Sequence, residues 1–335
     1  MKQLVLAAFV ALAASPAAAQ IEPPTLGLPI ACALGEDCVI QQYVDTDPGP
    51  GAKDHTCGDM TYDGHKGTDF RIADLDMMAQ GVTVMAASDG EVKAVRDGMD
   101  DFQYKRGEDD IPADRACGNG LLIDHGNGWT TQYCHLKKGS VSVEKGDMVQ
   151  RGSIIGQVGQ SGWTEFPHVH LQVMYEGKVV DPFASAETGM SGETSCGESH
   201  GGMWEEAAAE QLEYRYPAIL NTGFTDGGVE MKDVDSREKN LLRLDASTPA
   251  LVFFGRAVGL KPGDTQRITI TSPDGSTLVT NSTDPEQTNR AQAMAFVGKK
   301  RPASGWQPGV YAASYEVIRE GETIAEETGS IALAQ

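Results

Sequence analysis

The chain has 335 residues, of which 40% are hydrophobic, 22% charged and 7% aromatic. This globular composition excludes a chain that is disordered throughout, a collagen and a coiled coil. The formal net charge of −21 repels nucleic acid and anionic lipid surfaces, so we exclude both as partners. The length predicts two domains, and the 39 glycines favour a turn-rich, β-dominated chain.

The first residues have the pattern of a secretory signal peptide. One charge at Lys2 precedes an apolar run from Leu4 to Ala14, and Ala17–Ala19 precede Gln20. A positive start, a short apolar region and an A-x-A site are typical of a cleaved signal. We therefore expect residues 1–19 to be removed and the protein to be periplasmic or secreted, without a membrane span.

Six cysteines follow the signal, and in an exported protein an even number predicts disulfides rather than metal ligands. Many pairings are open to six cysteines, and the sequence alone does not decide between them. The expected pairs are Cys32 with Cys38, Cys117 with Cys134 across a hairpin, and, by remainder, Cys57 with Cys196.

The residues before the second domain divide into an arm and a strand-rich region. Residues 20–56, rich in proline and glycine, predict an extended N-terminal arm. Residues 57–200 predict an antiparallel β-sheet domain of short strands separated by turns, in which the stretch between Val95 and Cys117 is an exposed acidic loop. The clearest strands are Thr83–Ala87, Glu91–Val95, Leu121–His125, Trp129–Leu136, Ser140–Val143, Ile154–Val158 and Val169–Tyr175.

The rest of the chain predicts a connector and a second β domain. Residues 201–224 are expected to be a helical connector, with a helix from Met203 to Arg215 that is rich in Ala, Glu and Leu and ends before Pro217. Residues 225–335 alternate strand-like runs with turn signals, which predicts an immunoglobulin-like β-sandwich. The predicted fold class is therefore all-β, with a short helical element between two domains.

Three short motifs contain the residues that could carry chemistry. They are His65-Lys66-Gly67-Thr68-Asp69, Tyr133-Cys134-His135-Leu136 and Pro167-His168-Val169-His170-Leu171. In an extended strand the period of two places both imidazoles of the last motif on one face. By the same alternation, His135 shares a face with Tyr133, and Cys134 points to the opposite face. The remaining histidines, His55, His125 and His200, are expected at the surface.

Catalytic zinc needs three protein ligands and an open fourth position. Two imidazoles and one carboxylate supply that set, and further imidazoles are then free to transfer protons. Any one motif alone is better explained by solvated or hydrogen-bonded histidines without a metal. Four histidines in strand contexts that share faces favour a metal site instead.

In these three motifs the sequence resembles the lysostaphin-like, LytM-type zinc metalloendopeptidases of peptidase family M23, and the resemblance covers about residues 60–183. The resemblance implies that His65, Asp69 and His170 bind one zinc ion and that His135 and His168 are the two catalytic histidines. It further implies hydrolysis of peptide bonds in the cross-links or stems of peptidoglycan, in a narrow groove on an antiparallel sheet. Phe166 and Gln172 depart from the family's common pattern, in which a glycine and a glutamate stand at these places.

We therefore predict an exported zinc metalloendopeptidase that acts on peptidoglycan peptides. His168 is expected to act as general base and His135 to stabilise the oxyanion. Two alternatives stay open. One is a catalytically silent scaffold that binds wall peptides or activates another hydrolase. The other is that the C-terminal sandwich carries the main function by binding the wall or a protein partner. Trp163, Glu165 and Phe166 could line a groove, and the two aromatic residues could instead pack in a core.

Overall fold

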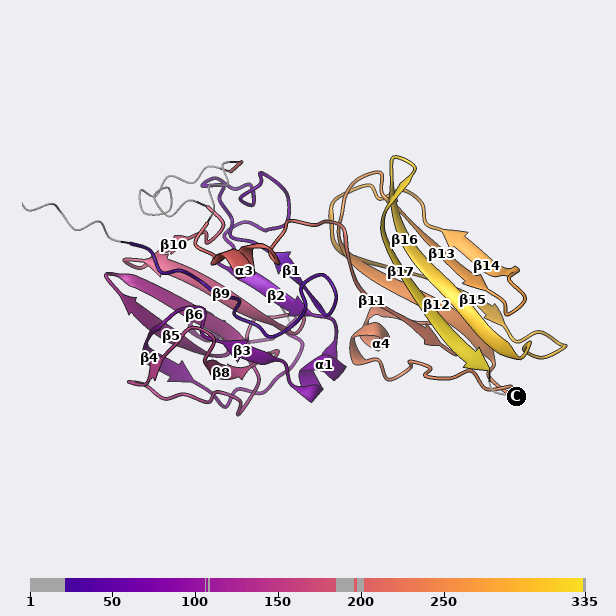
Figure 1. Cartoon of the computed structure of the whole chain (residues 1–335), viewed down its shortest axis with the longest axis horizontal. Coiled ribbons are helices and arrows are strands. Elements are labelled where there is room, and N and C mark those ends of the chain that lie inside the picture. The colour runs from indigo at the N-terminus through magenta and orange to yellow at the C-terminus, as the bar shows by residue number, and fades with distance from the viewer. Residues whose placement is uncertain (1–21, 106, 108, 185–195, 198–201, 334–335) are drawn as a thin grey trace, which may run out of the picture.

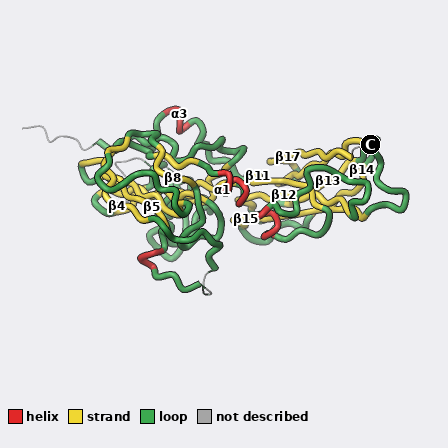
Figure 2. The backbone as a smooth tube through the Cα atoms, turned by 90° about the horizontal axis from the view of Figure 1, so that it is seen from below, coloured by secondary structure: helices red, strands yellow, loops and turns green. Residues whose placement is uncertain are grey.

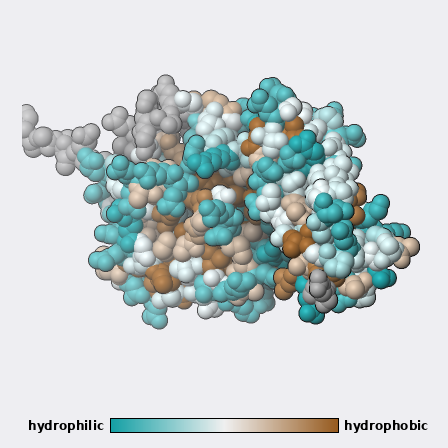
Figure 3. Space-filling view, turned by 45° about the vertical axis from the view of Figure 1, so that its right-hand side comes forward, coloured by the Kyte–Doolittle hydropathy of each residue, from teal (hydrophilic) through white to brown (hydrophobic). Residues whose placement is uncertain are grey.

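Two β-rich lobes lie side by side along the long axis of the molecule (Figure 1). This computed structural model describes residues 22–105, 107, 109–184, 196–197 and 202–333. The expected signal peptide at residues 1–19 and His200 lie outside the described residues. Within them, no helix is both long and apolar enough to cross a membrane. The predicted all-β class with antiparallel sheets is confirmed, and the face in Figure 3 is mostly hydrophilic.

The N-terminal lobe is built on one antiparallel sheet in the order β1-β2-β9-β6-β5-β4-β7, with β10 paired to β9. Its strands are β1 (Cys38–Gln42), β2 (Thr68–Ile72), β4 (Gly90–Arg96), β5 (Asn119–Gly126), β6 (Trp129–Leu136), β7 (Met148–Val149), β9 (His168–Tyr175) and β10 (Lys178–Val180). A separate pair contains β3 (Thr83–Met85) and β8 (Ile154–Gln157). Alternation in β9 buries Val169, Leu171 and Val173 in the core and leaves the opposite face to its histidines.

The region expected to be an extended arm contributes a strand to this sheet. Cys38–Gln42 form β1, which pairs with β2, and Leu26 and Ile30 are buried in the core of the same lobe. The sequence did not predict this strand because it is only five residues long and is surrounded by prolines and glycines. Nearly all of its side chains are buried, so the strand lacks the alternation of polar and apolar residues. The arm and the strand-rich region are thus one structural unit.

The C-terminal lobe contains two sheets that share one core. The first has the order β11-β12-β15 and the second β14-β13-β16-β17. The strands are β11 (Ala218–Thr225), β12 (Ala250–Leu260), β13 (Thr265–Thr271), β14 (Thr277–Ser282), β15 (Arg290–Lys300), β16 (Gly309–Arg319) and β17 (Glu322–Leu333). Inward residues of both sheets, such as Phe253 and Tyr315, form a continuous cluster. Its immunoglobulin-like character stays a prediction.

The helical connector is shorter than expected. The helix predicted from Met203 to Arg215 is reduced to α3 (Glu206–Ala209), which has no side-chain cap at its N-terminus. Glutamates four residues apart at 206 and 210 repel each other on one helix face, and burial of Leu212 in the N-terminal lobe fixes the following chain. Residues 218–224, expected in the connector, instead belong to Ala218–Thr225, the first strand of the C-terminal lobe.

The two lobes meet across a buried network of charges beside α1 (Leu75–Gln80) and α4 (Met231–Ser236) (Figure 1). Arg71 of β2 and Arg256 of β12 are 1% and 0% exposed, and both approach the Asp235 carboxylate of α4. Arg256 also donates to the backbone oxygen of Ala73. Burial, and then the Arg256 cation, lowers the pKa of Arg71 well below its usual range, and Asp235 opposes this. The Asp235 carboxylate is therefore the shared ionic partner of two buried guanidinium groups, one from each lobe.

A second buried cluster lies where the chain leaves β10. The His55 ring stacks on Phe183 with centroids 4.7 Å apart and meets the edge of Tyr43 at 4.8 Å. His55 is thus half-buried, contrary to its expected surface position, because aromatic rings from distant segments enclose its loop. His125 is also half-buried, and its two ring nitrogens contact Asp89 O and Thr131 Oγ1. Sequence reasoning on isolated loop residues missed both environments.

Asp181 in this cluster gives a pH-dependent prediction. Burial raises its pKa to about 7, and only Oδ1 has a partner, the Phe183 backbone N–H, while Oδ2 has none. As pH rises from 4 to 8 the unfolded chain ionises first, so the folded state loses up to about 4 kcal/mol of stability. Asp181→Asn removes this loss. We expect the variant to be more stable than the parent at pH 8 and similar to it at pH 4.

Urea denaturation at the two pH values measures this difference, because other titrating groups are common to both chains and cancel. Asp226→Asn, at an exposed position of the C-terminal lobe, is the matched control and should show no pH-dependent difference. An Asp181→Asn effect of equal size at pH 4 and pH 8 would contradict the titration account.

Candidate metal centre and active-site groove

Neighbouring strands at the centre of the N-terminal sheet bring the three motifs together. Strand β9 lies between β2 and β6. In the register of these pairs, Asp69 is opposite His170 and Arg71 is opposite His168, while Cys134 is opposite His170 on the other side. Cross-strand partners share a face of the sheet. Residues far apart in the sequence thus meet on one face of three adjacent strands.

His65, Asp69 and His170 form a group that could hold a metal ion. Their ligand atoms all lie within 4.8 Å of one another, and two ligands of a tetrahedral zinc ion lie about 3.4 Å apart. His65 Nε2 is 3.2 Å from Asp69 Oδ2, and His170 Nδ1 is 2.7 Å from Asp69 Oδ1. His65 Nε2 is buried and makes no hydrogen bond of good geometry. A buried ring nitrogen that has no hydrogen-bond partner and lies beside a carboxylate is suited to bind a metal ion.

Hydrogen bonds to backbone carbonyls decide which ring nitrogen each histidine presents to the groove. His65 Nδ1 lies 2.7 Å from Tyr43 O, and His135 Nδ1 lies 2.7 Å from Ser161 O. His168 Nδ1 lies 3.0 Å from both Phe166 O and Thr164 Oγ1. A carbonyl accepts only from an N–H, so each neutral ring keeps its proton at Nδ1 and a lone pair at Nε2. All three rings therefore present Nε2 for a metal or a proton.

The charges of the group match those of metal ligands. Burial raises the pKa of Asp69, but His65 and His168 outweigh it and hold that pKa well below its usual range. Burial, followed by the proximity of His168 and His170, lowers the pKa of His135 well below 6.5, and burial likewise lowers the pKa of His170. Burial also acts on His65, but the Asp69 carboxylate outweighs it and raises that pKa. The lowered pKa values of Asp69 and His170 favour the charged carboxylate and the neutral imidazole that bind a metal, whereas a metal at His65 would have to compete with a proton for that ring.

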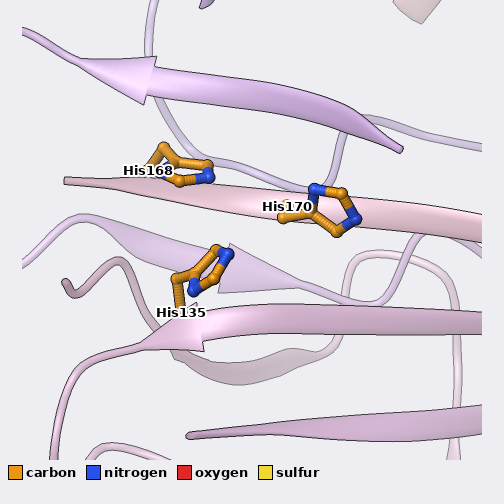
Figure 4. A group of neighbouring side chains, drawn as sticks. All are labelled: His135, His168 and His170. Carbon is orange, nitrogen blue, oxygen red and sulfur yellow. The ribbon is translucent and has the colours of Figure 1, made fainter. Parts of the chain in front are cut away.

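A second group overlaps the first. The ligand atoms of His135, His168 and His170 also lie within 4.8 Å of one another. Figure 4 shows His168 and His170 on one strand, with the His135 ring across from them. The His135 and His168 ring centroids are 4.7 Å apart. His170 belongs to both groups, so geometry alone does not decide which residues would hold the ion.

The sequence comparisons agree with this arrangement. The family model of peptidase family M23 matches residues 63–182, a range that contains all five site residues. Residues 63–182 are an M23 peptidase domain. The peptidoglycan DD-endopeptidase ShyA of Vibrio cholerae is 33% identical over 117 residues, which are 35% of this chain and 22% of that protein.

Two further relatives extend the comparison. The DD-carboxypeptidase/endopeptidase Mpg of Neisseria meningitidis is 32% identical over 106 residues, or 32% of this chain and 22% of Mpg. The crystal structure of a zinc containing peptidase from Vibrio cholerae has 26% sequence identity and a TM-score of 0.28, and the match covers 42% of this chain and 38% of that one. The chain thus spans about a fifth of the length of the curated relatives it matches.

The M23 domain departs from strand alternation at His135. Its backbone φ is 63°, a left-handed conformation that costs a non-glycine residue on the order of 1 kcal/mol. This turn at the end of β6 brings the His135 ring to the face of Cys134 and His170. Tyr133 points into the core instead, where its hydroxyl accepts from the Ala87 N–H. The expectation that His135 shares a face with Tyr133 and opposes Cys134 is therefore wrong.

All three expected disulfides are formed. Cys134 lies opposite His170 in the sheet, so its bridge to Cys117 lies in the wall of the groove. The turn at His135 brings the ring of that residue into the same groove. Both cysteines are covalently committed, so neither offers a thiolate to a metal.

The metal group lies in an open groove of about 1220 Å³. Trp163, Glu165 and Phe166 line this groove. Of the two roles left open in the sequence analysis, the groove role is therefore the one observed. The Phe166 ring lies 4.8 Å from that of His168 and 4.2 Å from the Arg71 guanidinium carbon. Trp163 stacks on Tyr104 of the acidic loop, with centroids 5.7 Å apart.

The acidic loop of the M23 domain, residues 97–116, forms one side of this groove. It includes the short 3₁₀ helix η1 (Ala113–Arg115) and projects away from the sheet (Figure 2). Asp101 ties the loop to the domain by accepting from the backbone N–H groups of Lys138 and Gln160. The loop is therefore exposed, as expected, and is also anchored beside the groove.

Sequence reasoning missed the residues that support the histidines. Tyr43 and Ser161 act through their backbone oxygens, which no side-chain pattern reveals. Thr164 lies four residues before His168, and its hydroxyl contacts His168 Nδ1. Gly67 did carry a signal, because a Cβ there would lie 2.5 Å from His170 Nε2. A glycine inside the first motif thus leaves room for a ring of the third.

Proposed function

We propose that this protein is an exported zinc metalloendopeptidase that hydrolyses peptide bonds in the cross-links or stems of peptidoglycan. The observation that carries the proposal is the meeting of His65, Asp69 and His170 in an open groove, with His135 and His168 beside them. The M23 match and the names of two relatives, a peptidoglycan DD-endopeptidase and a DD-carboxypeptidase/endopeptidase, support the substrate class. Three disulfides support an oxidising compartment.

His65, Asp69 and His170 would hold the zinc ion, through His65 Nε2, an Asp69 oxygen and His170 Nδ1. When bound, zinc supplies a Lewis acid that polarises the scissile carbonyl and activates water for attack. Asp69 orients the other two groups, since both imidazoles contact its carboxylate. The carboxylate charge and the neutral rings are the forms in which these ligands bind a divalent ion.

His168 would act as the general base. Phe166 O and Thr164 Oγ1 hold its Nδ1, so the unprotonated Nε2 faces the groove 3.4 Å from Asp69 Oδ1. A proton taken there would be stabilised by the adjacent carboxylate. The ring is only 5% exposed and cannot swing away easily.

His135 would stabilise the negative charge that develops on the oxygen of the scissile carbonyl. Ser161 O accepts its Nδ1 proton, so neutral His135 offers a lone pair at Nε2 and only the protonated ring can donate to an oxyanion. Burial disfavours that protonated form in the absence of negative charge. The developing oxyanion would supply the negative charge that favours the protonated ring, so His135, with a second proton taken from solvent, would donate from Nε2 to the oxyanion.

The experiment is digestion of purified peptidoglycan by the wild type, His168→Ala and His135→Ala, followed by mass analysis of the products. Each variant should keep zinc and fold but lose hydrolysis by a factor of about 100 or more, because a general base or an oxyanion donor is removed. His125→Ala, which alters a histidine outside the groove, is the control and should stay active.

Two outcomes would contradict this function. If the wild type with one zinc per chain releases no products, the catalytically silent scaffold is the better description. If both histidine variants retain activity, another residue is the base. Binding of a protein partner through the C-terminal sandwich stays a separate prediction.

A further inference from the structure

The groove of the M23 domain is completed by the other lobe. Its lining includes four consecutive residues at the start of β15, Asn289, Arg290, Ala291 and Gln292. A smaller hollow of about 300 Å³ between the lobes shares three of them, Asn289, Arg290 and Ala291. Arg290 therefore stands where the two hollows meet.

Direct bonds to strands of the M23 sheet fix this segment. Gln41 Nε2 of β1 donates to Ala291 O at 2.8 Å, and Arg71 Nη1 of β2 donates to Gln292 Oε1 at 3.0 Å. Both donor residues are 1% exposed. Gln42, next to Gln41, is the register partner of Asp69. Gln41 thus attaches the segment to β1, and β1 pairs directly with β2, the strand that carries Asp69.

The groove lining has a slight excess of positive charge, whereas the whole chain is strongly negative. The chain carries a net charge of −21, yet the lining contains Lys66, Arg71, Arg96 and Arg290. The carboxylates in the lining are Asp69, Asp114 and Glu165, of which Asp69 belongs to the metal group. The lining thus has one cation more than it has carboxylates, although the whole chain is acidic, and this local excess favours an anionic ligand.

Arg290 is the cation best placed to contact a substrate from the C-terminal lobe. Its Nε donates to Glu286 Oε2 at 2.9 Å, which orients the guanidinium, and its side chain remains 54% exposed. Arg71 is buried and bonded to Gln41 and Gln292, so it positions the segment instead. A guanidinium recognises a carboxylate through two parallel hydrogen bonds.

We propose that the C-terminal lobe is part of the substrate-binding groove and that Arg290 binds a free carboxylate of the peptide, to one side of the scissile bond. This inference rests on the proposed peptidase function and adds the chemistry of one recognised group. Arg290 is a specificity-determining residue in this view and takes no part in bond cleavage.

The test uses the full chain with zinc and two synthetic cross-linked peptides that differ only in a terminal carboxylate or carboxamide. Arg290→Gln should raise KM for the carboxylate peptide by roughly 2- to 5-fold, the range for an exposed ion pair, and leave kcat unchanged within error. KM for the carboxamide peptide should not change. Arg290→Lys should restore part of the affinity, and Arg243→Gln, at an exposed arginine outside both hollows, should behave as wild type.

Binding of the same labelled peptides, measured by fluorescence anisotropy, separates this inference from the proposed function. A preference for the carboxylate that disappears in Arg290→Gln supports the inference even if neither peptide is cleaved. Cleavage without any Arg290-dependent preference overturns the inference and leaves the peptidase function intact. An equal loss of affinity for both peptides would also overturn it, because that result indicates a structural role.

Discussion

His65→Ala and Asp69→Asn are expected to lose zinc and all measurable hydrolysis, whereas His135→Ala should keep about one zinc per chain. Removal of one of three protein ligands leaves two, and even loss of a supporting residue costs about 10- to 100-fold in metal affinity. The loss from a direct ligand should therefore exceed about 100-fold. Metal analysis of the purified proteins after dialysis, together with peptidoglycan digestion, measures both effects.

This set of variants decides between the two overlapping groups of possible ligands. His170→Ala lowers zinc content in either case, because His170 belongs to both. His65 and Asp69 belong only to the first group, and His135 only to the second. Zinc lost from His135→Ala but retained in His65→Ala would show that the second group holds the ion. His125→Ala is the histidine control, and circular dichroism checks that each variant folds.

Asp235→Ala is expected to lower the free energy of unfolding by about 3–5 kcal/mol. The substitution leaves the Arg71 and Arg256 guanidinium groups buried without the carboxylate they share, and breaking a buried ion pair on one side has a cost of that order. Urea denaturation followed by tryptophan fluorescence measures the change, since Trp129 and Trp204 report on one lobe and Trp306 on the other.

Two further variants make the Asp235 result specific. Asp226→Ala removes an exposed carboxylate from the same lobe and should change stability by less than about 0.5 kcal/mol. The double variant Asp235→Ala/Arg256→Met should recover part of the loss, because one of the stranded cations is gone. A loss that is the same in the single and double variants would mean that Asp235 acts through packing and not through charge.

Much of the fold was predictable because the signals were local. Trp129–Leu136 was predicted as a strand with the limits of β6. The hairpin turn before it is a local signal as well, because Asn127 and Gly128 adopt the positive φ that a tight hairpin needs. Strand β1 was missed because burial of nearly the whole strand removes the alternation that reveals half-buried strands. The helix after Met203 was overestimated, because composition favours a helix there but tertiary burial of Leu212 and repulsion between glutamates do not.

The candidate site was predictable as a set of residues but not as an arrangement. The types and spacings of His65, Asp69, His168 and His170 indicated a metal site, and strand pairing brings them together. The orientation of His135 depends on one left-handed backbone angle, which its sequence neighbours do not encode. The presence of Arg290 in the groove was equally unpredictable, because it depends on how two lobes dock through residues more than 200 positions apart.

The disulfide between Cys57 and Cys196 closes a covalent loop across a sequence separation of 139. His65, Asp69, His135, His168 and His170 all lie inside that loop. A proteolytic cut in the projecting loop at residues 97–116 would divide the chain into two pieces, one with His65 and Asp69 and the other with the three remaining histidines. The bridge would still join these pieces, so a nicked chain would keep the residues of the candidate metal site on two tethered polypeptides, which would separate only in a reducing solution.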